Sequence, residues 1–404
     1  MYLKYETYAD FVEGNQAYKY HECETCNGIR ELSIEDLDIT IENRKMHFKD
    51  FLVLTCLKCG ENCVPQHSKQ MVDGCYKIMI RDGHLEGIQK YTGYKKKFMY
   101  CSQQNFNYDH RDYYNIPGLC FDEENSEEGF LTPVYFTKNV LIYFMHHPEY
   151  KMNLFSESYG VISYKDEWNV PFGINRNGKV IFWLGDLNLM DITSLEIMKP
   201  HNVDSDHKLI DSEFYAAQLC CIWSEPNKEL KACYKKQELF DLILKKYGIN
   251  LFHLEDEIEQ QMRDFDKPVI FTKKSIEAAI NMLHKVLIEG VNIKSFRELY
   301  VQLYEHPEKG YKEWKSIKFY HKLLEKIISD QDKVKEIIAP LYLINDLRQY
   351  YDHLLPKDKK EYIEANVKTS LGIDSFENID LVYDGLINKL NILFQYLVIE
   401  YSRD

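Results

Sequence analysis

Two short cysteine pairs near the N-terminus have the clearest chemistry. Cys23 and Cys26 are separated by two residues, as are Cys56 and Cys59, and a glycine follows each pair closely. A Cys-x-x-Cys turn lets two thiolates converge on one metal ion, and the glycine relieves the tight turn in which backbone N–H groups point at sulfur. The four cysteines therefore predict a structural zinc site with no open coordination position. Four reduced thiols in a sheet are the alternative.

A second group of chemically capable residues lies near the C-terminus, in Leu347-Arg-Gln-Tyr-Tyr-Asp-His-Leu354. Arg348 carries a permanent positive charge, and His353 titrates near neutral pH. An arginine can stabilise charge on a phosphate and a histidine can take or give a proton, so the pair suits metal-free cleavage of an RNA phosphodiester. The neighbouring side chains that could orient them are Asp346, Gln349, Tyr351 and Asp352.

Both members of this pair also have structural explanations. Asp352 stands four residues after Arg348, which is the spacing of an ion pair on one helix face. His353 could instead interact with the last carbonyl groups of a helix, where a cation is favourable. A buried or internally paired arginine would favour these explanations over catalysis.

A third candidate site is the loop His201-Asn-Val-Asp-Ser-Asp-His207. Its titratable side chains could bind a divalent ion or serve acid–base chemistry. The spacing fits no known motif, and acidic and serine residues also cap helix starts, as Asp211 or Ser212 is expected to do. The candidate ligands are His201, Asp204, Asp206 and His207, with Glu213 shortly after them.

The pattern of apolar residues predicts a multidomain α+β chain. Alternating segments between the cysteine pairs are typical of strands, so residues 1–70 are expected to form a zinc-ribbon-like module. Residues 71–225 are expected to form a β-rich middle domain of unknown role. There, Val140-Leu-Ile-Tyr-Phe-Met145 reads as a strand-like or buried run, and Asn177-Gly178 predicts a hairpin turn within residues 170–184.

Residues 226–404 are expected to form an all-helical domain, because apolar residues recur there at helical spacing. Gly248 is expected to cap the first helix. Pro340 is expected to open the helix that carries Arg348, since proline is tolerated in a first turn. The predicted helices are Lys231–Tyr247, Lys273–Glu289, Trp314–Ser329, a helix from about residue 339, and Leu381–Tyr401.

Arg348 and His353, placed late in a helical domain, resemble the Arg-x(4–6)-His signature of the HEPN superfamily, which includes toxin and antiphage RNases. The resemblance covers residues from about 273 to the end, and Gln349 stands where an asparagine often follows the arginine. It implies a HEPN-like bundle, an RNA substrate and a homodimer. Five residues on a helix separate two side chains by about 140°, so two antiparallel copies would complete each other's sites.

Composition limits the remaining possibilities. A formal net charge of −14 argues against a nonspecific nucleic-acid coat protein but leaves a local RNA site open. No apolar run approaches the length of a membrane span, and the first residues do not resemble a signal peptide. Eleven cysteines without such a signal favour metal ligands and buried thiols over disulfides. We therefore expect a cytoplasmic protein without membrane partners.

The sequence thus predicts a metal-independent endoribonuclease effector, with a role in antiphage defence or growth arrest by analogy with HEPN proteins. The zinc-bearing half would act as sensor or scaffold, with a partner protein as a possible trigger. The alternative is a non-enzymatic, zinc-containing recognition or scaffold protein with an inactive helical dimerisation domain.

Overall fold

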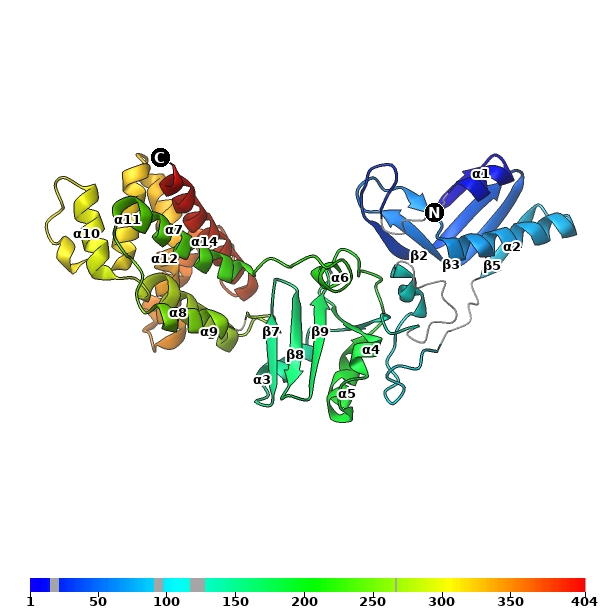
Figure 1. Ribbon diagram of the computed structural model, residues 1–404, viewed down its shortest axis with the longest axis horizontal. Coiled ribbons are helices and arrows are strands. Elements are labelled where there is room, and N and C mark those ends of the chain that lie inside the picture. Colours follow the sequence, from blue (N-terminus) through cyan, green and yellow to red (C-terminus); the bar gives the residue numbers. More distant parts are fainter. Residues whose placement is uncertain (15–21, 91–96, 117–127, 266, 404) are drawn as a thin grey trace. The chain divides into compact units, whose positions relative to one another are not determined.

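The computed structural model describes residues 1–14, 22–90, 97–116, 128–265 and 267–403. The chain divides into two compact units, Met1–Ser224 and Glu225–Asp404 (Figure 1). The first unit contains two separate sheets and the second is helical. The predicted α+β class, with an N-terminal sheet, a sheet-rich middle and a helical C-terminal region, is confirmed. Among the described helices, none combines the length and apolar character that crossing a membrane requires.

The N-terminal sheet is built around one long antiparallel hairpin. Its strands β2 (Arg30–Ile41) and β3 (Arg44–Cys56) pair from Arg30 opposite Cys56 to Ile41 opposite Arg44. The first strand β1 joins β2 in parallel, and the last strand β5 joins β3 in parallel, so the sheet extends beyond residue 70. The other elements are β1 (Tyr2–Tyr5), α1 (Tyr8–Glu13), β4 (Asn62–Cys63), α2 (Gln66–Asp82) and β5 (Glu86–Lys90).

One face of this sheet forms a core with the two helices. Phe11 of α1 and Val72 of α2 are fully buried together with alternating residues of the hairpin, such as Leu37 and Ile39. Alternation puts every second side chain on this face, which is why the predicted strand segments could cover a core. Burial of these side chains fixes the hairpin register, since a shift of one residue would turn the apolar set to solvent.

The middle sheet is antiparallel throughout, in the order β11-β6-β10-β9-β8-β7. The predicted hairpin is β9–β10, where Gly178 has the positive φ that the turn requires. The run Val140–Met145 is helical, as part of α3. The strands are β6 (Pro133–Phe136), β7 (Tyr150–Leu154), β8 (Tyr159–Tyr164), β9 (Trp168–Ile174), β10 (Val180–Trp183) and β11 (Asn202–Val203); the helices are η1 (His110–Asn115), α3 (Val140–His146), α4 (Leu184–Leu187), α5 (Ile192–Met198), η2 (Lys199–His201) and α6 (Glu213–Leu219).

The helical unit packs around α12 (Gln331–Asp352), which contacts α9, α11, α13 and α14. Helix α9 (Lys273–His284) runs directly into a π-helical turn, η3 (Lys285–Glu289). Gly248 has a positive φ and caps the first helix as expected. The remaining helices are α7 (Lys228–Tyr247), α8 (Glu255–Arg263), α10 (Ile293–Leu303), η4 (Tyr311–Glu313), α11 (Ser316–Ile327), α13 (Lys357–Leu371) and α14 (Ile379–Ser402).

The expectation that Pro340 opens its helix is wrong. Helix α12 begins nine residues earlier, after the N-cap Asp330, and Pro340 is buried inside it. A proline here leaves one backbone carbonyl of the preceding turn without its helical donor. The helix continues because Val334 and Ile338, before the proline, and Leu341 and Ile344, after it, all face the same core.

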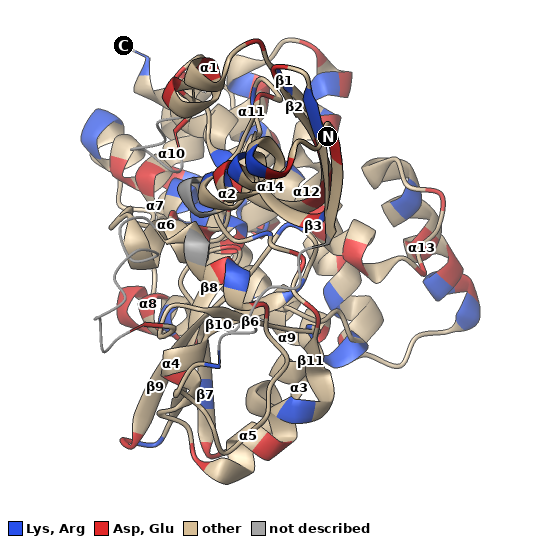
Figure 2. Cartoon of the chain, turned by 90° about the vertical axis from the view of Figure 1, so that its right-hand side faces the viewer, with Lys and Arg blue, Asp and Glu red and all other residues tan. Residues whose placement is uncertain are grey.

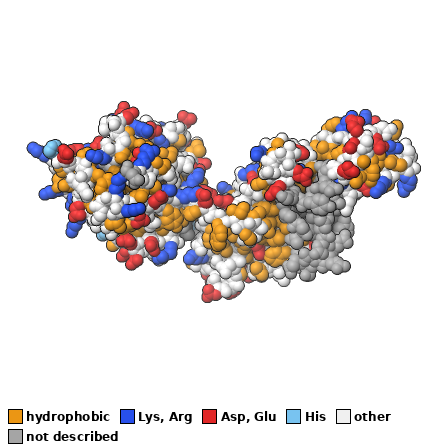
Figure 3. All heavy atoms as spheres, turned by 45° about the horizontal axis from the view of Figure 1, so that its top comes forward, with side chains coloured by type: hydrophobic (Ala, Val, Ile, Leu, Met, Phe, Trp, Pro, Cys, Tyr) orange, Lys and Arg blue, Asp and Glu red, His pale blue; other side chains and the backbone are white. Residues whose placement is uncertain are grey.

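Basic and acidic residues are spread over the helices and strands of the chain (Figure 2). On the face shown in Figure 3, basic and acidic side chains lie intermixed over the helical unit rather than in one extended basic surface. Any contact of this face with nucleic acid would therefore be local, since an extended coat needs a continuous positive field.

Candidate functional site

The four predicted metal-ligating cysteines come together. Their sulfur atoms all lie within 4.8 Å of one another. Cys23 Sγ is 3.6 Å from Cys59 Sγ, and Cys26 Sγ is 3.5 Å from Cys56 Sγ. Four thiolates at this separation match the donor set of a structural zinc site, in which no position is left for a substrate.

The β2–β3 hairpin explains how cysteine pairs so far apart in sequence converge. It places Arg30 opposite Cys56, so the turn before β2 and the turn after β3 meet at the same end of the sheet. The first turn is closed by a bridge between Glu22 and Ile29. The unusually long gap between the pairs is therefore the length of the hairpin that joins them.

The backbone around the sulfurs suits metal binding. The N–H groups of Lys58 and Cys59 point at Cys56 Sγ, at 3.4 and 3.5 Å. The N–H of Cys59 is the main reason that the pKa of the Cys56 thiol falls to about 6. Gly60 has a positive φ, as the sequence predicted for a turn glycine. These donors favour the thiolate of Cys56, the form that binds zinc.

Gly28 serves a different purpose from Gly60. In its turn the positive φ belongs to Asn27, and Gly28 has none. A Cβ at Gly28 would lie 2.7 Å from Lys58 Cβ and 2.9 Å from Cys56 Sγ. Gly28 is therefore required because the two cysteine turns approach each other too closely for any side chain.

An acidic residue supports the first turn from beside the sulfurs. Glu61 accepts hydrogen bonds from Cys23 Sγ and from Thr25 Oγ1, both at 2.9 Å. The guanidinium of Arg30, almost fully buried, lies 3.7 Å from the same carboxylate. These contacts orient the ligand turn, and the Arg30 guanidinium offsets part of the negative charge of the carboxylate and the thiolates. The hydrogen bond to Glu61 raises the pKa of the Cys23 thiol, so zinc binding would displace that proton.

Arg348 lies in the last turn of α12 and is held within its own chain. Its Nη1 is 3.2 Å from Glu289 Oε1 and 3.3 Å from His284 Nδ1, and its Nε is 3.6 Å from Asp352 Oδ2. The side chain is 37% exposed, so the guanidinium remains accessible from solvent while it is paired. The ion pair with Asp352, proposed from its spacing as the structural explanation, is present.

His284 and Glu289 come from α9 and its π-helical continuation. The imidazole of His284 is nearly buried, and its Nδ1 is 3.2 Å from Glu289 Oε1. Burial, and then the adjacent Arg348, lower the pKa of His284. The ring is therefore neutral at neutral pH and can accept a hydrogen bond from the guanidinium. The π-helical turn aims Glu289 at α12, and such turns are frequent at functional sites.

His353 differs from Arg348 in having an unpaired side chain. It is the C-cap of α12, its backbone is extended, and it is exposed. Its N–H donates to the Gln349 carbonyl at 3.2 Å, but within the described part of the chain its imidazole has no hydrogen-bond or ion-pair partner. Its ring is therefore accessible to an external substrate.

The predicted supporting residues have separate roles. Tyr351 is buried in the helical core, and burial raises its pKa. Asp346 accepts from Asn366 Nδ2 at 3.0 Å, and Gln349 accepts from Lys359 Nζ at 2.9 Å. Asp352 accepts from Asn281 Nδ2 at 3.0 Å and also faces Arg348. Of the four, only Asp352 contacts the candidate arginine.

The loop at residues 201–207 does not bring its acidic and histidine side chains into one group. Among the residues that the structure describes, the four cysteines are the one cluster with ligand atoms close enough to share an ion. Asp206 accepts from Asn175 and Asn177, at 3.0 Å each. Asp204 pairs with Asn107, and the His201 carbonyl accepts from the N–H of Thr137.

His207 forms a buried pair that the sequence did not suggest. Its Nδ1 lies 2.7 Å from Asp112 Oδ1, and Asp112 is fully buried. Ser205 Oγ donates to the other oxygen of Asp112. His207 also has a positive φ, an uncommon conformation for a residue with a side chain. The pair joins the η1 segment to the loop after β11.

Sequence reasoning therefore missed His284, Glu289 and Asp112. His284 and Glu289 lie in a segment that was expected to be helical, but no short motif marks them. The available signal was a histidine within an otherwise apolar helix face, which is more often structural than functional.

Comparisons of the chain with models of known protein families, with curated proteins and with solved structures found no match.

Proposed function

We propose that the helical unit is a HEPN-like, metal-independent endoribonuclease site formed by Arg348 and His353. The observation that carries the proposal is their position at the end of α12, where a half-exposed guanidinium precedes an exposed, unpaired imidazole by five residues. These are the two groups that RNA cleavage without a metal requires.

In this mechanism the 2′-oxygen of RNA attacks the adjacent phosphorus, and the bond from phosphorus to the 5′-oxygen breaks. His353 takes the proton of the 2′-hydroxyl or gives one to the departing 5′-oxygen. Arg348 stabilises the negative charge on the non-bridging phosphate oxygens. The products are a 2′,3′-cyclic phosphate and a 5′-hydroxyl, and the protons balance when two histidines act.

A homodimer would supply both histidines. His353 follows the end of α12 in an extended conformation, and within one copy Arg348 pairs with Glu289 and Asp352 rather than with His353, so a second copy would complete the site. We propose that two copies of α12 face each other across a two-fold axis. By analogy with HEPN effectors, the cellular role would be antiphage defence or growth arrest, with a partner protein as trigger and the zinc-bearing unit as sensor or scaffold.

The four cysteines would hold zinc as a structural ion in this protein. Cys23, Cys26, Cys56 and Cys59 supply the thiolates, and Gly28 leaves the space they need. Bound zinc would stabilise the fold of the N-terminal sheet without taking part in cleavage, because a four-thiolate site is closed.

The second candidate function is a zinc-containing recognition or scaffold protein whose helical unit is inactive. The observation that favours it is the pairing of Arg348 with Glu289 and Asp352. An arginine that is already neutralised by two carboxylates has a structural reason to be there.

A cleavage assay on a labelled RNA strand, with and without chelator, separates the two functions. We expect the full chain to cleave RNA in both conditions, and Arg348→Ala and His353→Ala each to lower the rate by about 100-fold or more. The matched controls Arg263→Ala and His306→Ala remove exposed residues of the same types and should leave the rate unchanged.

A chain that is folded and dimeric but cleaves no RNA, alone or with cell extract as a source of trigger, would refute the nuclease. Cleavage that survives both substitutions would refute the assignment of catalysis to Arg348 and His353. Cleavage that stops with chelator would refute the metal-independent mechanism.

A further inference from the structure

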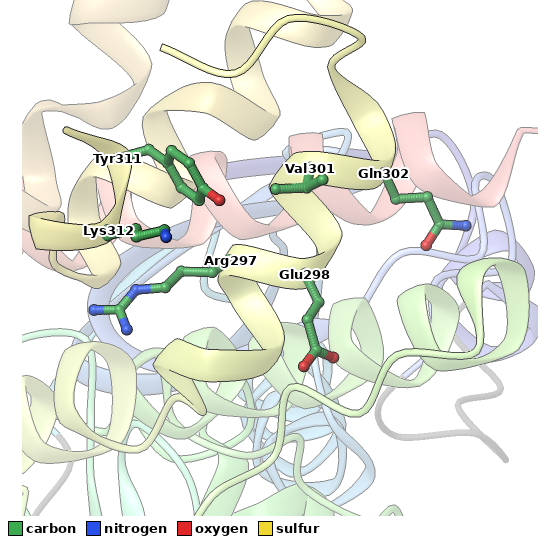
Figure 4. Close-up of a pocket in the computed structure, with 6 residues that line it drawn as sticks. All are labelled: Arg297, Glu298, Val301, Gln302, Tyr311 and Lys312. Atoms are coloured by element: carbon green, nitrogen blue, oxygen red, sulfur yellow. The ribbon is translucent and has the colours of Figure 1, made fainter. Parts of the chain in front are cut away.

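A hollow of about 530 Å³ opens beside α10 in the helical unit (Figure 4). It is bounded by one face of this helix and by the short turn η4. Its volume suits a small organic ligand rather than a single ion. The lining residues are Arg297, Glu298, Val301, Gln302, Tyr311 and Lys312.

Two cations in this hollow lack counter-ions. Figure 4 shows the side chains of Arg297 and Lys312 extending on the same side of the helix. Neither has an ion pair with any described residue, and the buried Nε of Arg297 has no hydrogen-bond partner. Two cations that line one hollow favour an anionic ligand, because hydrogen bonds between charged groups are stronger than those between neutral groups.

The other walls provide different chemistry. Tyr311 offers an aromatic ring beside Lys312, and Val301 an apolar surface one helical turn from Arg297. Glu298 leaves the helix in another direction and adds a carboxylate, which accepts hydrogen bonds and repels simple anions. The ligand that fits must therefore combine phosphate, hydroxyl donors and a flat ring.

The loop that carries Tyr311 and Lys312 is fixed by packing. Tyr300 of α10 contacts the rings of Tyr311 and Trp314, with centroids 5.7 and 5.1 Å away. Its hydroxyl accepts from the N–H of Glu308 at 3.1 Å. Gly310, the N-cap of η4, has the positive φ of the left-handed region. The hollow is thus formed before a ligand binds, which lowers the entropy that binding costs.

We propose that this hollow binds a free nucleoside phosphate. Arg297 and Lys312 would bind the phosphate groups, Glu298 would accept from the ribose hydroxyls, and the base would lie against Tyr311 and Val301. This ligand class uses both cations, the carboxylate and the ring of the hollow, whereas inorganic phosphate would leave Glu298 and Tyr311 unused. The proposal does not depend on RNA cleavage by Arg348 and His353.

Titration calorimetry of the full chain with ADP tests the proposal, with pyrophosphate and a short RNA strand as comparison probes. We expect ADP to bind, and Arg297→Gln and Lys312→Gln each to weaken it by about tenfold or more, the range for a hydrogen bond to a charged group. Glu298→Gln should weaken ADP but not pyrophosphate. Arg263→Gln, an exposed arginine of α8, is the matched control and should not change binding.

If Arg297→Gln fails to fold, Val301→Trp provides an independent variant, because Val301 is 45% exposed and a tryptophan there would fill the hollow and abolish ADP binding. Absence of ADP binding at millimolar concentration would overturn the proposal, as would equal effects of Arg297→Gln and Arg263→Gln. If pyrophosphate binds as tightly as ADP, the hollow recognises phosphate groups alone and the nucleoside proposal is overturned. RNA that binds more tightly and depends on Arg297 would show a nucleic-acid surface instead.

Discussion

At the scale of single residues, the main question is how firmly Arg348 is held. Its ion pairs with Glu289 and Asp352 are partly exposed to solvent, and pairs of this kind contribute only about 0–1 kcal/mol each. A phosphate that accepts two hydrogen bonds from a guanidinium offers a stronger, bidentate contact. The pairing therefore positions Arg348, and it is weak enough for a phosphate to compete with it, as the proposed cleavage requires.

Gly28 provides a residue-scale prediction for the metal site. We expect Gly28→Ala to lower zinc affinity by about 10–100-fold without removing a ligand, because the new Cβ would collide with Cys56 Sγ and Lys58 Cβ. Competition with a chromogenic chelator measures this. Gly74→Ala, at an open position in α2, is the control and should be neutral or stabilise by about 0.5–1 kcal/mol. Equal zinc affinity in both variants would contradict the prediction.

The His207–Asp112 pair predicts a pH dependence. Burial lowers the pKa of His207, but the charge and hydrogen bond of Asp112 outweigh it, so the net shift is upward. The pKa of Asp112 is also raised, chiefly by burial. The folded state therefore holds protons more tightly than the unfolded chain, and this stabilisation is complete below about pH 6.5 and lost as the pH rises through the folded pKa of His207.

The Cys56 thiol of the same unit, with a pKa of about 6, contributes in the opposite direction, so the His207 effect is measured as a difference between two chains. As the pH rises from about 6 to 8, the unfolding temperature of the first unit in the parent chain should fall relative to that of His207→Gln. His84→Gln, an exposed histidine of the same unit, should keep the slope of the parent chain. A parent chain whose unfolding temperature rises relative to that of His207→Gln over this range would show that the sign is wrong.

At the scale of elements, the π-helical turn η3 decides which groups meet Arg348. It follows α9 without a break and places Glu289 against α12, beside His284. A regular α-helix would present a residue five positions after His284 about 140° away from it. The wider turn therefore lets both side chains reach the same guanidinium.

Neutralising this turn's carboxylate should strengthen RNA binding. In Glu289→Gln the guanidinium keeps Asp352 but loses one competing charge, so we expect affinity for RNA to rise by about fivefold, which corresponds to about 1 kcal/mol. Filter binding across salt concentrations measures this. Glu259→Gln, an exposed carboxylate of α8, is the matched control. Weaker binding in Glu289→Gln alone would mean that Glu289 is needed to orient Arg348.

At the scale of the whole molecule, the division at Ser224 and Glu225 separates the two candidate chemistries. The four cysteines lie in the first unit, and Arg348 and His353 lie in the second. Each unit has its own core, so each should respond separately to changes made within it.

Scanning calorimetry of the full chain should therefore resolve two transitions. Removing the metal with a strong chelator, or changing Cys56→Ser, should lower the temperature of the first unit's transition and leave the other unchanged, because zinc stabilises only the fold that holds it. Ser102→Ala, outside the cysteine turns, is the control. One transition that shifts as a whole would show that the units unfold together.

The sequence by itself determined the elements whose signals are local. Two Cys-x-x-Cys pairs and alternating strands were enough to predict the metal site and the sheet beneath it, since the turn spacing and the strand period are set by neighbouring residues. Helical periodicity likewise identified α7, α9, α11, α12 and α14, but it did not identify α8, α10 or α13.

Tertiary structure decided what depends on packing between distant segments. Pro340 lies inside α12 because burial of the helix on both sides of it outweighs the lost hydrogen bond. The sequence could not show that Val140–Met145 is helical, because a short apolar run has no period that distinguishes a strand from a buried helix. The pairing of Arg348 with Glu289 and the His207–Asp112 pair each join residues far apart in the chain, and no local pattern specifies such contacts.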